Sequence, residues 1–170
     1  MSHGIVWKYG DNVNTDVIFP GRYTYQMMPP EEMAKHALED LDPEFAPKVK
    51  PGDVIVAGKN FGSGSSREQA ATCLKAAGVQ AIVARSFARI YFRNAINIGL
   101  PVLQSPEAVD HLEAGDPVDI DLVRGEIRST RGTFSFSPLP ESVLGIIAAG
   151  GLIEYTKAKL TVDETEEKKE

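Results

Sequence analysis

Apolar and polar positions change their period along this chain in the way that is typical of an α/β protein. Residues 54–57 and 81–84 are short, continuous apolar runs, which indicate buried strands. Residues 66–77 lie between them and end at Gly78, which indicates a helix with a glycine C-cap. Because strand, helix and strand follow in this order, we expect a βαβ unit whose two strands are parallel.

The flanking segments predict further elements on both sides of this unit. We expect strands at residues 5–9, 100–103, 118–122, 126–128 and 133–136, and helices at residues 31–41, 87–98, 106–113 and 141–149. Arg124 and Gly125 separate two alternating segments, which predicts a hairpin. Charged residues dominate from residue 157 onward, and residues 164–170 are expected to be frayed or disordered. The pattern predicts one α/β domain over residues 1–156 and a charged tail over residues 157–170.

Composition narrows the functional classes. The chain has 170 residues, of which 42% are hydrophobic and 25% charged, as expected for one globular domain with a real core. The net charge is −6 and no basic cluster offsets it, so we expect no nucleic-acid binding. We find no apolar run of transmembrane length and no signal peptide, so we expect no membrane association and a cytoplasmic location.

Candidate metal ligands are few. Cys73 is the one cysteine, so the chain can form neither an internal disulfide nor a thiolate cluster by itself. Its apolar neighbours indicate a buried structural thiol rather than a reactive one. His3, His36 and His111 are scattered without ligand spacing, which favours surface or packing roles. We therefore expect the chain to hold no metal.

The most informative segment is the glycine-rich turn at residues 60–69. Gly62 and Gly64 allow a sharp turn and a close approach to a ligand. Ser65 and Glu68 have the spacing of a capping box, which predicts that a helix begins here and that its free N–H groups are exposed. Arg67 adds a planar fork that matches a carboxylate. The segment predicts an anion-binding corner with a hydroxyl available for proton transfer, although spacing alone is equally consistent with an ordinary capped turn.

Three better-known glycine motifs do not match this turn. A phosphate-binding loop requires Gly-Lys followed by Ser or Thr, and here Asn60 follows Lys59. A dinucleotide-binding turn requires a third glycine where Arg67 stands. A nucleophile elbow has two residues more between its glycines than the pair at Gly62 and Gly64. Phosphate, dinucleotide and acyl-transfer chemistry of these types are thus not indicated.

Several segments together resemble a known family. Residues 62–68 (Gly-Ser-Gly-Ser-Ser-Arg-Glu) and 86–90 (Ser-Phe-Ala-Arg-Ile) lie in the order seen in the swivelling domain of the aconitase superfamily. Residues 91–101 are similar to the small subunits of 3-isopropylmalate dehydratase, and residues 14–20 resemble the family's Thr-Asp-x-Ile-x-Pro turn. The resemblance extends from about residue 5 to about residue 155.

The resemblance implies a swivelling β/β/α fold and one half of a heteromeric enzyme. A large partner subunit would carry a 4Fe–4S cluster on three of its own cysteines, and this chain would bind no cofactor. The implied hydro-lyase reaction moves a hydroxyl between neighbouring carbons of a dicarboxylic acid. For this family it interconverts 2-isopropylmalate and 3-isopropylmalate in leucine biosynthesis.

The resemblance also implies roles for individual residues. Ser65 matches the serine that acts as the catalytic base in aconitase, and Arg67 matches the arginine that holds a substrate carboxylate. Ser66, between them, would hydrogen-bond the substrate or the loop. A serine can take a proton from carbon only as an alkoxide, which free helix N–H groups, Arg67 and exclusion of water would stabilise. For Arg89 we favour a structural ion pair, and for Arg93 the choice stays open.

A loop at residues 21–30 is expected to set the substrate. In the family it closes over the variable group of the substrate, which makes Arg22, Tyr23 and Tyr25 candidate substrate contacts. Tyr25 stands where homoaconitase-like relatives have an arginine, and an aromatic there suits an isopropyl group. Homoaconitase, 2,3-dimethylmalate or methylcitrate-type acids remain alternatives, as does a non-catalytic anion-binding domain. Exposure of residues 22–28 and 63–67 in the absence of the partner leaves self-association of the isolated chain open.

Overall fold

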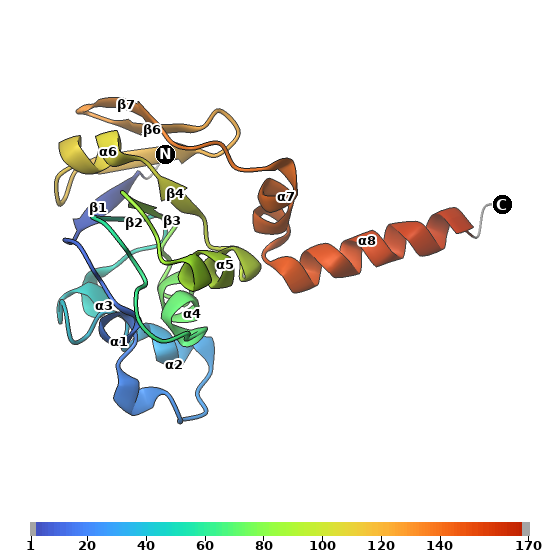
Figure 1. Cartoon of the computed structure of the whole chain (residues 1–170), viewed down its shortest axis with the longest axis horizontal. Helices are drawn as coiled ribbons and strands as arrows, with labels where there is room; N and C mark the ends of the chain where they lie inside the picture. The colour runs from blue at the N-terminus through green and yellow to red at the C-terminus, as the bar shows by residue number, and fades with distance from the viewer. Residues whose placement is uncertain (1–2, 168–170) are drawn as a thin grey trace.

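The computed structural model describes residues 3–167 and builds one mixed sheet (Figure 1). Within those residues the seven strands are ordered β4-β3-β2-β1-β5-β6-β7. The first four are parallel, and β1 pairs with β5 in the antiparallel sense, as do β5 with β6 and β6 with β7. The strands are β1 (Gly4–Lys8), β2 (Val54–Ala57), β3 (Ala81–Ala84), β4 (Val102–Gln104), β5 (Pro117–Asp121), β6 (Glu126–Ser129) and β7 (Gly132–Ser135).

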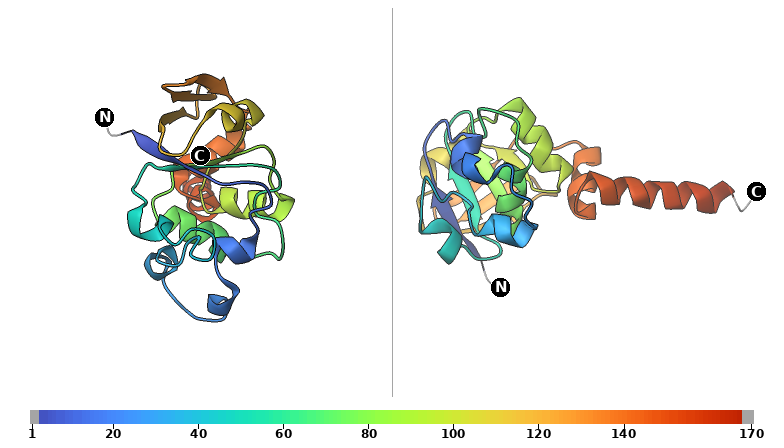
Figure 2. Two further views of the ribbon diagram at one scale, coloured as in Figure 1. Left: turned by 90° about the vertical axis from the view of Figure 1, so that its left-hand side faces the viewer. Right: turned by 90° about the horizontal axis from the view of Figure 1, so that it is seen from below.

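Helices gather mainly beside the parallel half of the sheet (Figures 1 and 2). Figure 1 shows α6 instead beside the antiparallel strands. The helices are α1 (Thr15–Ile18), the 3-10 turn η1 (Gly21–Tyr23), α2 (Pro30–Ala34), α3 (Phe45–Lys48), α4 (Gln69–Ala76), α5 (Arg89–Asn97), α6 (Pro106–His111), α7 (Glu141–Ala149) and α8 (Leu152–Glu167). None of the helices described is both long enough and apolar enough to cross a membrane.

The buried βαβ unit is confirmed, and its strands explain the two-layered core. Every residue of β2 and β3 is buried, because successive side chains point to opposite faces and both faces are covered. Ile55 and Ile82 belong to the cluster packed under α1, α4 and α5, whereas Val56 and Val83 belong to a second cluster shared with α6 and the antiparallel strands. At β2 and β3 the sheet is therefore covered on both faces, so a ligand can reach these two strands only at their ends.

One predicted helix is much shorter than expected. The helix predicted over residues 31–41 ends at Ala34, and residues 35–41 form turns. Leu38 has a φ of 56° and its N–H donates to the carbonyl oxygen of Ile18 at 2.8 Å. Because this N–H is used by a residue twenty positions earlier, the segment cannot continue the helical ladder. Helix α3, which follows it, was not predicted.

The C-terminus also differs from the prediction. Helix α7 has the predicted bounds, and Gly150 closes it with a φ of 88°. Residues 164–167, where we expect fraying or disorder, belong in the structure to α8, which continues to Glu167 and projects from the body of the molecule (Figure 2). This helix crosses the expected boundary between residues 156 and 157. Residues 168–170 of the predicted tail lie outside the described residues.

Candidate functional site

The glycine-rich turn lies where three parallel strands end. It follows β2, and backbone hydrogen bonds join it to the segments that follow β1 and β3. The N–H of Gly62 donates to Val13, and the N–H of Phe61 donates to Ser86, at 2.8 and 3.1 Å. Because the carboxyl ends of parallel strands share one edge of a sheet, this edge is the position in an open α/β sheet where ligands bind.

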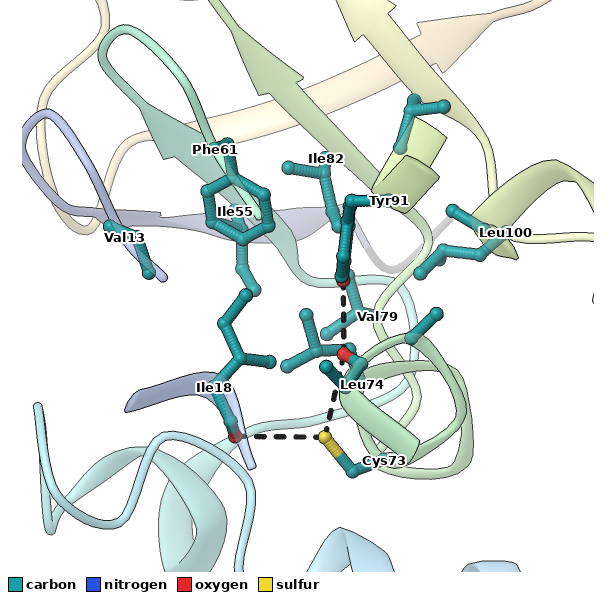
Figure 3. Packing of buried hydrophobic residues seen from close by; sticks show 14 of the residues in the cluster. Val13, Ile18, Ile55, Phe61, Cys73, Leu74, Val79, Ile82, Tyr91 and Leu100 are labelled. Atoms are coloured by element: carbon teal, nitrogen blue, oxygen red, sulfur yellow. Dashed lines mark hydrogen bonds between the residues drawn. The ribbon is translucent and has the colours of Figure 1, made fainter. Parts of the chain in front are cut away.

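Gly62 makes this arrangement possible. It has a φ of 82°, and a Cβ built on it would lie 2.1 Å from Cγ of Tyr91 in α5. Tyr91 is itself buried, packs edge-on against Phe61 at 5.3 Å between ring centroids, and donates its hydroxyl to the carbonyl oxygen of Ala70 at 3.0 Å (Figure 3). Only a glycine lets the turn approach α5 this closely, so Gly62 sets the distance between the turn and the start of that helix.

Ser65 is not a helix cap, which corrects the predicted capping box. Helix α4 begins at Gln69, and Glu68 precedes it without a side-chain capping bond. The carbonyl oxygen of Ser65 instead accepts a 2.8 Å hydrogen bond from the hydroxyl of Thr15, which holds the chain outside the helix for three more residues. The Ser65 side chain is exposed and has no hydrogen-bond partner within the described residues. Its hydroxyl is thus available to a ligand.

Arg67 is held in place by acceptors on the N-terminal segment. Its guanidinium forms an ion pair with Asp16 and lies 3.4 Å from the carbonyl oxygen of Phe19. The side chain is only 17% exposed. It precedes α4 rather than lying in its first turn. A buried and oriented arginine is suited to bind one carboxylate in a fixed geometry.

Ser65, Ser66 and Arg67 line one small pocket with the start of α5. The pocket has a volume of about 170 Å³, and Arg89 and Asn94 line its other side. The side-chain amide of Asn94 donates to the hydroxyl oxygen of Ser66 at 3.5 Å. A larger hollow of about 520 Å³ lies near the junction of α7 and α8, but none of the predicted site residues lines it. The smaller pocket, which the predicted residues Ser65, Ser66 and Arg67 line, is therefore the candidate functional site.

The other predicted contacts lie outside this pocket. Arg22 forms ion pairs with Glu39 and Asp40, and the hydroxyl of Tyr23 donates to Glu39 at 3.0 Å. Tyr23 also stacks on His36, whose ring nitrogen lies 2.6 Å from Glu39. The structure therefore ties Arg22 and Tyr23 to an acidic segment rather than to Ser65.

Glu39 stays ionised at the centre of this contact. Burial acts to raise the pKa of its carboxyl, but hydrogen bonds from His36, Tyr23 and Arg22 outweigh burial and hold the pKa below its ordinary value. The negative charge on Glu39 therefore keeps the base of the loop attached to the turns that follow α2.

The tip of the loop is exposed, while its base touches the site. Tyr25 and Met27 are 98% and 103% exposed. A Cβ at Gly21 would lie 3.4 Å from the Arg67 guanidinium, and the side-chain amide of Gln69 donates to the carbonyl oxygen of Thr24 at 3.3 Å. The base of the loop thus lies beside Arg67 and Gln69, and the tip reaches into solvent.

The chain's own residues do not fit an iron–sulfur cluster. Cys73 is fully buried, with its sulfur 3.7 Å from the carbonyl oxygens of Ile18 and Ala70 (Figure 3). Burial raises the pKa of the Cys73 thiol well above its ordinary value, so it does not supply a thiolate ligand. Among residues 3–167 no three His, Cys, Asp or Glu side chains gather as a metal site. His36 and His111 stack on aromatic rings, as expected of packing residues.

Sequence reasoning missed four residues of this site. Thr15 and Asp16 were identified only as part of a turn, and their contacts with Ser65 and Arg67 come from residues about fifty positions away. Asn94 carried no signal of its own. Arg89 was expected to form an ion pair; within the described chain it forms none, and it lines the pocket. Helix α5 begins at Arg89, so Arg89 lies in its first turn.

Comparison with known proteins places this geometry in context. The model of the aconitase C-terminal domain matches residues 13–108. The 3-isopropylmalate dehydratase small subunit of Caldicellulosiruptor bescii is 56% identical over 162 residues, which cover 94% of this chain and 97% of the relative. That of Aquifex aeolicus is 53% identical over 160 residues, covering 92% and 95%.

A solved structure is similar over nearly the whole chain. The crystal structure of 3-isopropylmalate dehydratase from Methanocaldococcus jannaschii superposes with a TM-score of 0.90 at 44% sequence identity, covering 96% of this chain and 97% of that one. The expected α/β fold of the aconitase C-terminal type is therefore confirmed. The family match includes the glycine-rich turn, Arg67 and the start of α5.

Proposed function

The chain belongs to the family of 3-isopropylmalate dehydratase small subunits, and from this premise we propose how its residues take part in the reaction. The family activity is a hydro-lyase isomerisation of 2-isopropylmalate and 3-isopropylmalate in leucine biosynthesis. The observation that carries this function is identity above one half with such subunits along almost the entire chain. The pocket that groups Ser65, Ser66 and Arg67 supplies the chemistry.

We propose Ser65 as the base that removes a proton from a substrate carbon. Its side chain is exposed in the pocket and is not used as a helix cap. To act on carbon it must be an alkoxide, which a nearby positive charge and exclusion of water stabilise. Arg67 lines the same pocket, and the first turn of α5 begins there without a side-chain cap. Closure of the partner subunit over this edge would exclude water.

Arg67 and Ser66 are proposed to bind the substrate. Asp16 orients the Arg67 guanidinium, which leaves its remaining N–H groups for one substrate carboxylate. Asn94 lies within reach of the Ser66 hydroxyl and would orient it toward the substrate. These contacts fix which carbon faces Ser65, because binding in one geometry converts the proton transfer into an intramolecular step.

The loop at residues 21–30 is proposed to select the side group of the substrate. Tyr25 and Met27 are exposed in the isolated chain, which favours their burial against the substrate and the partner on closure. Arg22 and Tyr23 would then leave or rearrange their contacts with Glu39 and Asp40. An aromatic Tyr25 favours an isopropyl group over a third carboxylate.

The partner is proposed to be a large subunit that holds a 4Fe–4S cluster. Such a cluster supplies Lewis-acid chemistry at the departing hydroxyl. This chain contributes the pocket, the base and the carboxylate contacts. We further propose that residues 1–156 form the swivelling domain, that the assembly works in the cytoplasm without nucleic acid or membrane, and that the isolated chain can self-associate through its partner-facing edge.

Reconstitution tests this function. The chain is mixed with a candidate large subunit whose cluster has been rebuilt anaerobically, and turnover is measured on 3-isopropylmalate, 2,3-dimethylmalate and homocitrate-type acids. We expect turnover of 3-isopropylmalate with the highest kcat/KM. Turnover confined to another acid would contradict the substrate assignment. No turnover of any acid, with a cluster shown to be intact, would favour a non-catalytic anion-binding domain.

A further inference from the structure

Arg89 has no role in the function proposed above, yet it lines the same pocket as Ser65 and Arg67. The pocket therefore contains two arginines, which differ in their surroundings. Arg67 is mostly buried and paired with Asp16, whereas Arg89 is exposed and forms no ion pair in the described part of the chain. One guanidinium is fixed in advance, and the other is free to pair with a ligand.

The position of Arg89 is unfavourable without an anion. It is the first residue of α5, and a positive charge at a helix N-terminus is disfavoured by the helix dipole. The first turn of α5 contains no acidic residue, and Ala88 at the cap position offers no side-chain acceptor. A bound carboxylate would offset this unfavourable placement of the Arg89 charge.

The substrate of the proposed reaction has two carboxylates, and Arg67 accounts for one of them. Resting on that proposed function, we propose that Arg89 binds the second carboxylate, so that the two arginines together select a dicarboxylic acid. A guanidinium matches a carboxylate with two parallel hydrogen bonds, which gives direction as well as charge. Asn94, five residues further along α5, lies beside Ser66, so α5 would contribute to substrate orientation through two side chains.

Inhibition of the reconstituted complex by two probes tests this assignment. The first probe, 2-isopropylsuccinate, has both carboxylates and no hydroxyl, and the second, 4-methylpentanoate, has one carboxylate. Arg89→Gln should raise the Ki of the diacid by about 10- to 100-fold, as expected for the loss of a hydrogen-bonded charge. The Ki of the monoacid should change by less than about twofold, and Arg89→Lys should recover part of the loss.

Arg93→Gln is the matched control, because Arg93 is also exposed on α5 but does not line the pocket. It should change neither Ki. Equal effects of Arg89→Gln on both probes, or effects no larger than those of Arg93→Gln, would overturn the assignment.

A second readout separates this proposal from the proposed function. If the wild-type complex fails to convert 3-isopropylmalate, the proposed function is wrong. The role of Arg89 is then tested by NMR on the full chain without a partner. The Nε–Hε resonance of Arg89 should then shift on titration with 2-isopropylsuccinate and not with 4-methylpentanoate at equal ionic strength. A resonance that responds to neither probe, or equally to both, would overturn the assignment.

Discussion

The hydroxyl of Thr15 donates a 2.8 Å hydrogen bond to the carbonyl oxygen of Ser65. Thr15 is the first residue of α1 and is 2% exposed. The bond joins the segment that follows β1 to the turn that follows β2, and it holds Ser65 outside α4. The position of the proposed base is thus fixed by a residue fifty positions earlier in the chain.

Thr15→Val is predicted to impair both stability and turnover. Valine keeps the shape but removes the donor, so the free energy of unfolding should fall by about 1–2 kcal/mol. Displacement of Ser65 should lower kcat of the reconstituted complex by about tenfold or more. Urea unfolding and steady-state kinetics measure the two effects. Thr15→Ser keeps the hydroxyl and should retain most of kcat; an equal loss in both variants would contradict a role for the bond.

Local signals in the sequence were sufficient for the central unit of the fold. The apolar runs of β2 and β3 are continuous because both faces are buried, so their assignment did not depend on distant residues. Helix α7 was also predicted with its observed bounds, because Gly150 ends it with a backbone conformation that glycine favours.

Contacts between residues distant in sequence set the helix bounds that were predicted wrongly from the sequence. Helix α4 begins at Gln69 and not at residue 66 as predicted, because Thr15 binds the Ser65 carbonyl oxygen. The helix at residues 31–41 was cut short because the N–H of Leu38 binds the carbonyl oxygen of Ile18. Both competing partners are distant in sequence, and neither leaves a local pattern.

In the candidate site, too, some residues could be predicted from a local segment and others only from long-range contacts. Ser65, Ser66 and Arg67 were predicted from one short segment and do meet in one pocket. Asp16, by contrast, became part of the site only through its ion pair with Arg67, which no spacing along the chain reveals.

Substitutions of the two turn glycines are predicted to differ in their effect. Gly62→Ala would place its Cβ 2.1 Å from the buried Tyr91 ring at a φ of 82°, so the free energy of unfolding should fall by about 3 kcal/mol or more. At Gly64, with a φ of 97°, the nearest atom to the Cβ would be the Thr15 hydroxyl oxygen at 3.3 Å. Gly64→Ala should cost only about 1–2 kcal/mol. Chemical unfolding of both variants checks this order, and equal losses would contradict it.

The buried thiol of Cys73 is predicted to be unreactive in the folded chain. Burial raises its pKa and encloses the sulfur, so both the thiolate fraction and the access of a reagent are low. Labelling by a thiol reagent should be about a thousandfold slower in native buffer than in urea, because it requires local or global opening. The urea-unfolded chain is the control. Rapid native labelling would show that the thiol is accessible and would reopen its assignment as a structural residue.

Tyr25→Arg is predicted to shift substrate preference. Tyr25 is 98% exposed, so the substitution should leave folding unchanged. An arginine on the closing loop would favour an additional carboxylate over an apolar group, and the ratio of kcat/KM for homocitrate-type acids to that for 3-isopropylmalate should rise about tenfold. Val123→Arg, at a 90% exposed position between β5 and β6, is a matched control for added charge. An unchanged ratio in Tyr25→Arg would exclude the residue from substrate selection.

The central claim is that this chain supplies the base of a hydro-lyase through Ser65. The most direct measurement compares the reconstituted complex containing the wild-type chain, Ser65→Ala or Ser142→Ala, where Ser142 is an exposed serine on α7. We expect Ser65→Ala to lower kcat on 3-isopropylmalate by about a hundredfold or more with an unchanged assembly and cluster content, while Ser142→Ala keeps wild-type kcat. Full turnover by the Ser65→Ala complex would contradict the assignment of Ser65 as the base.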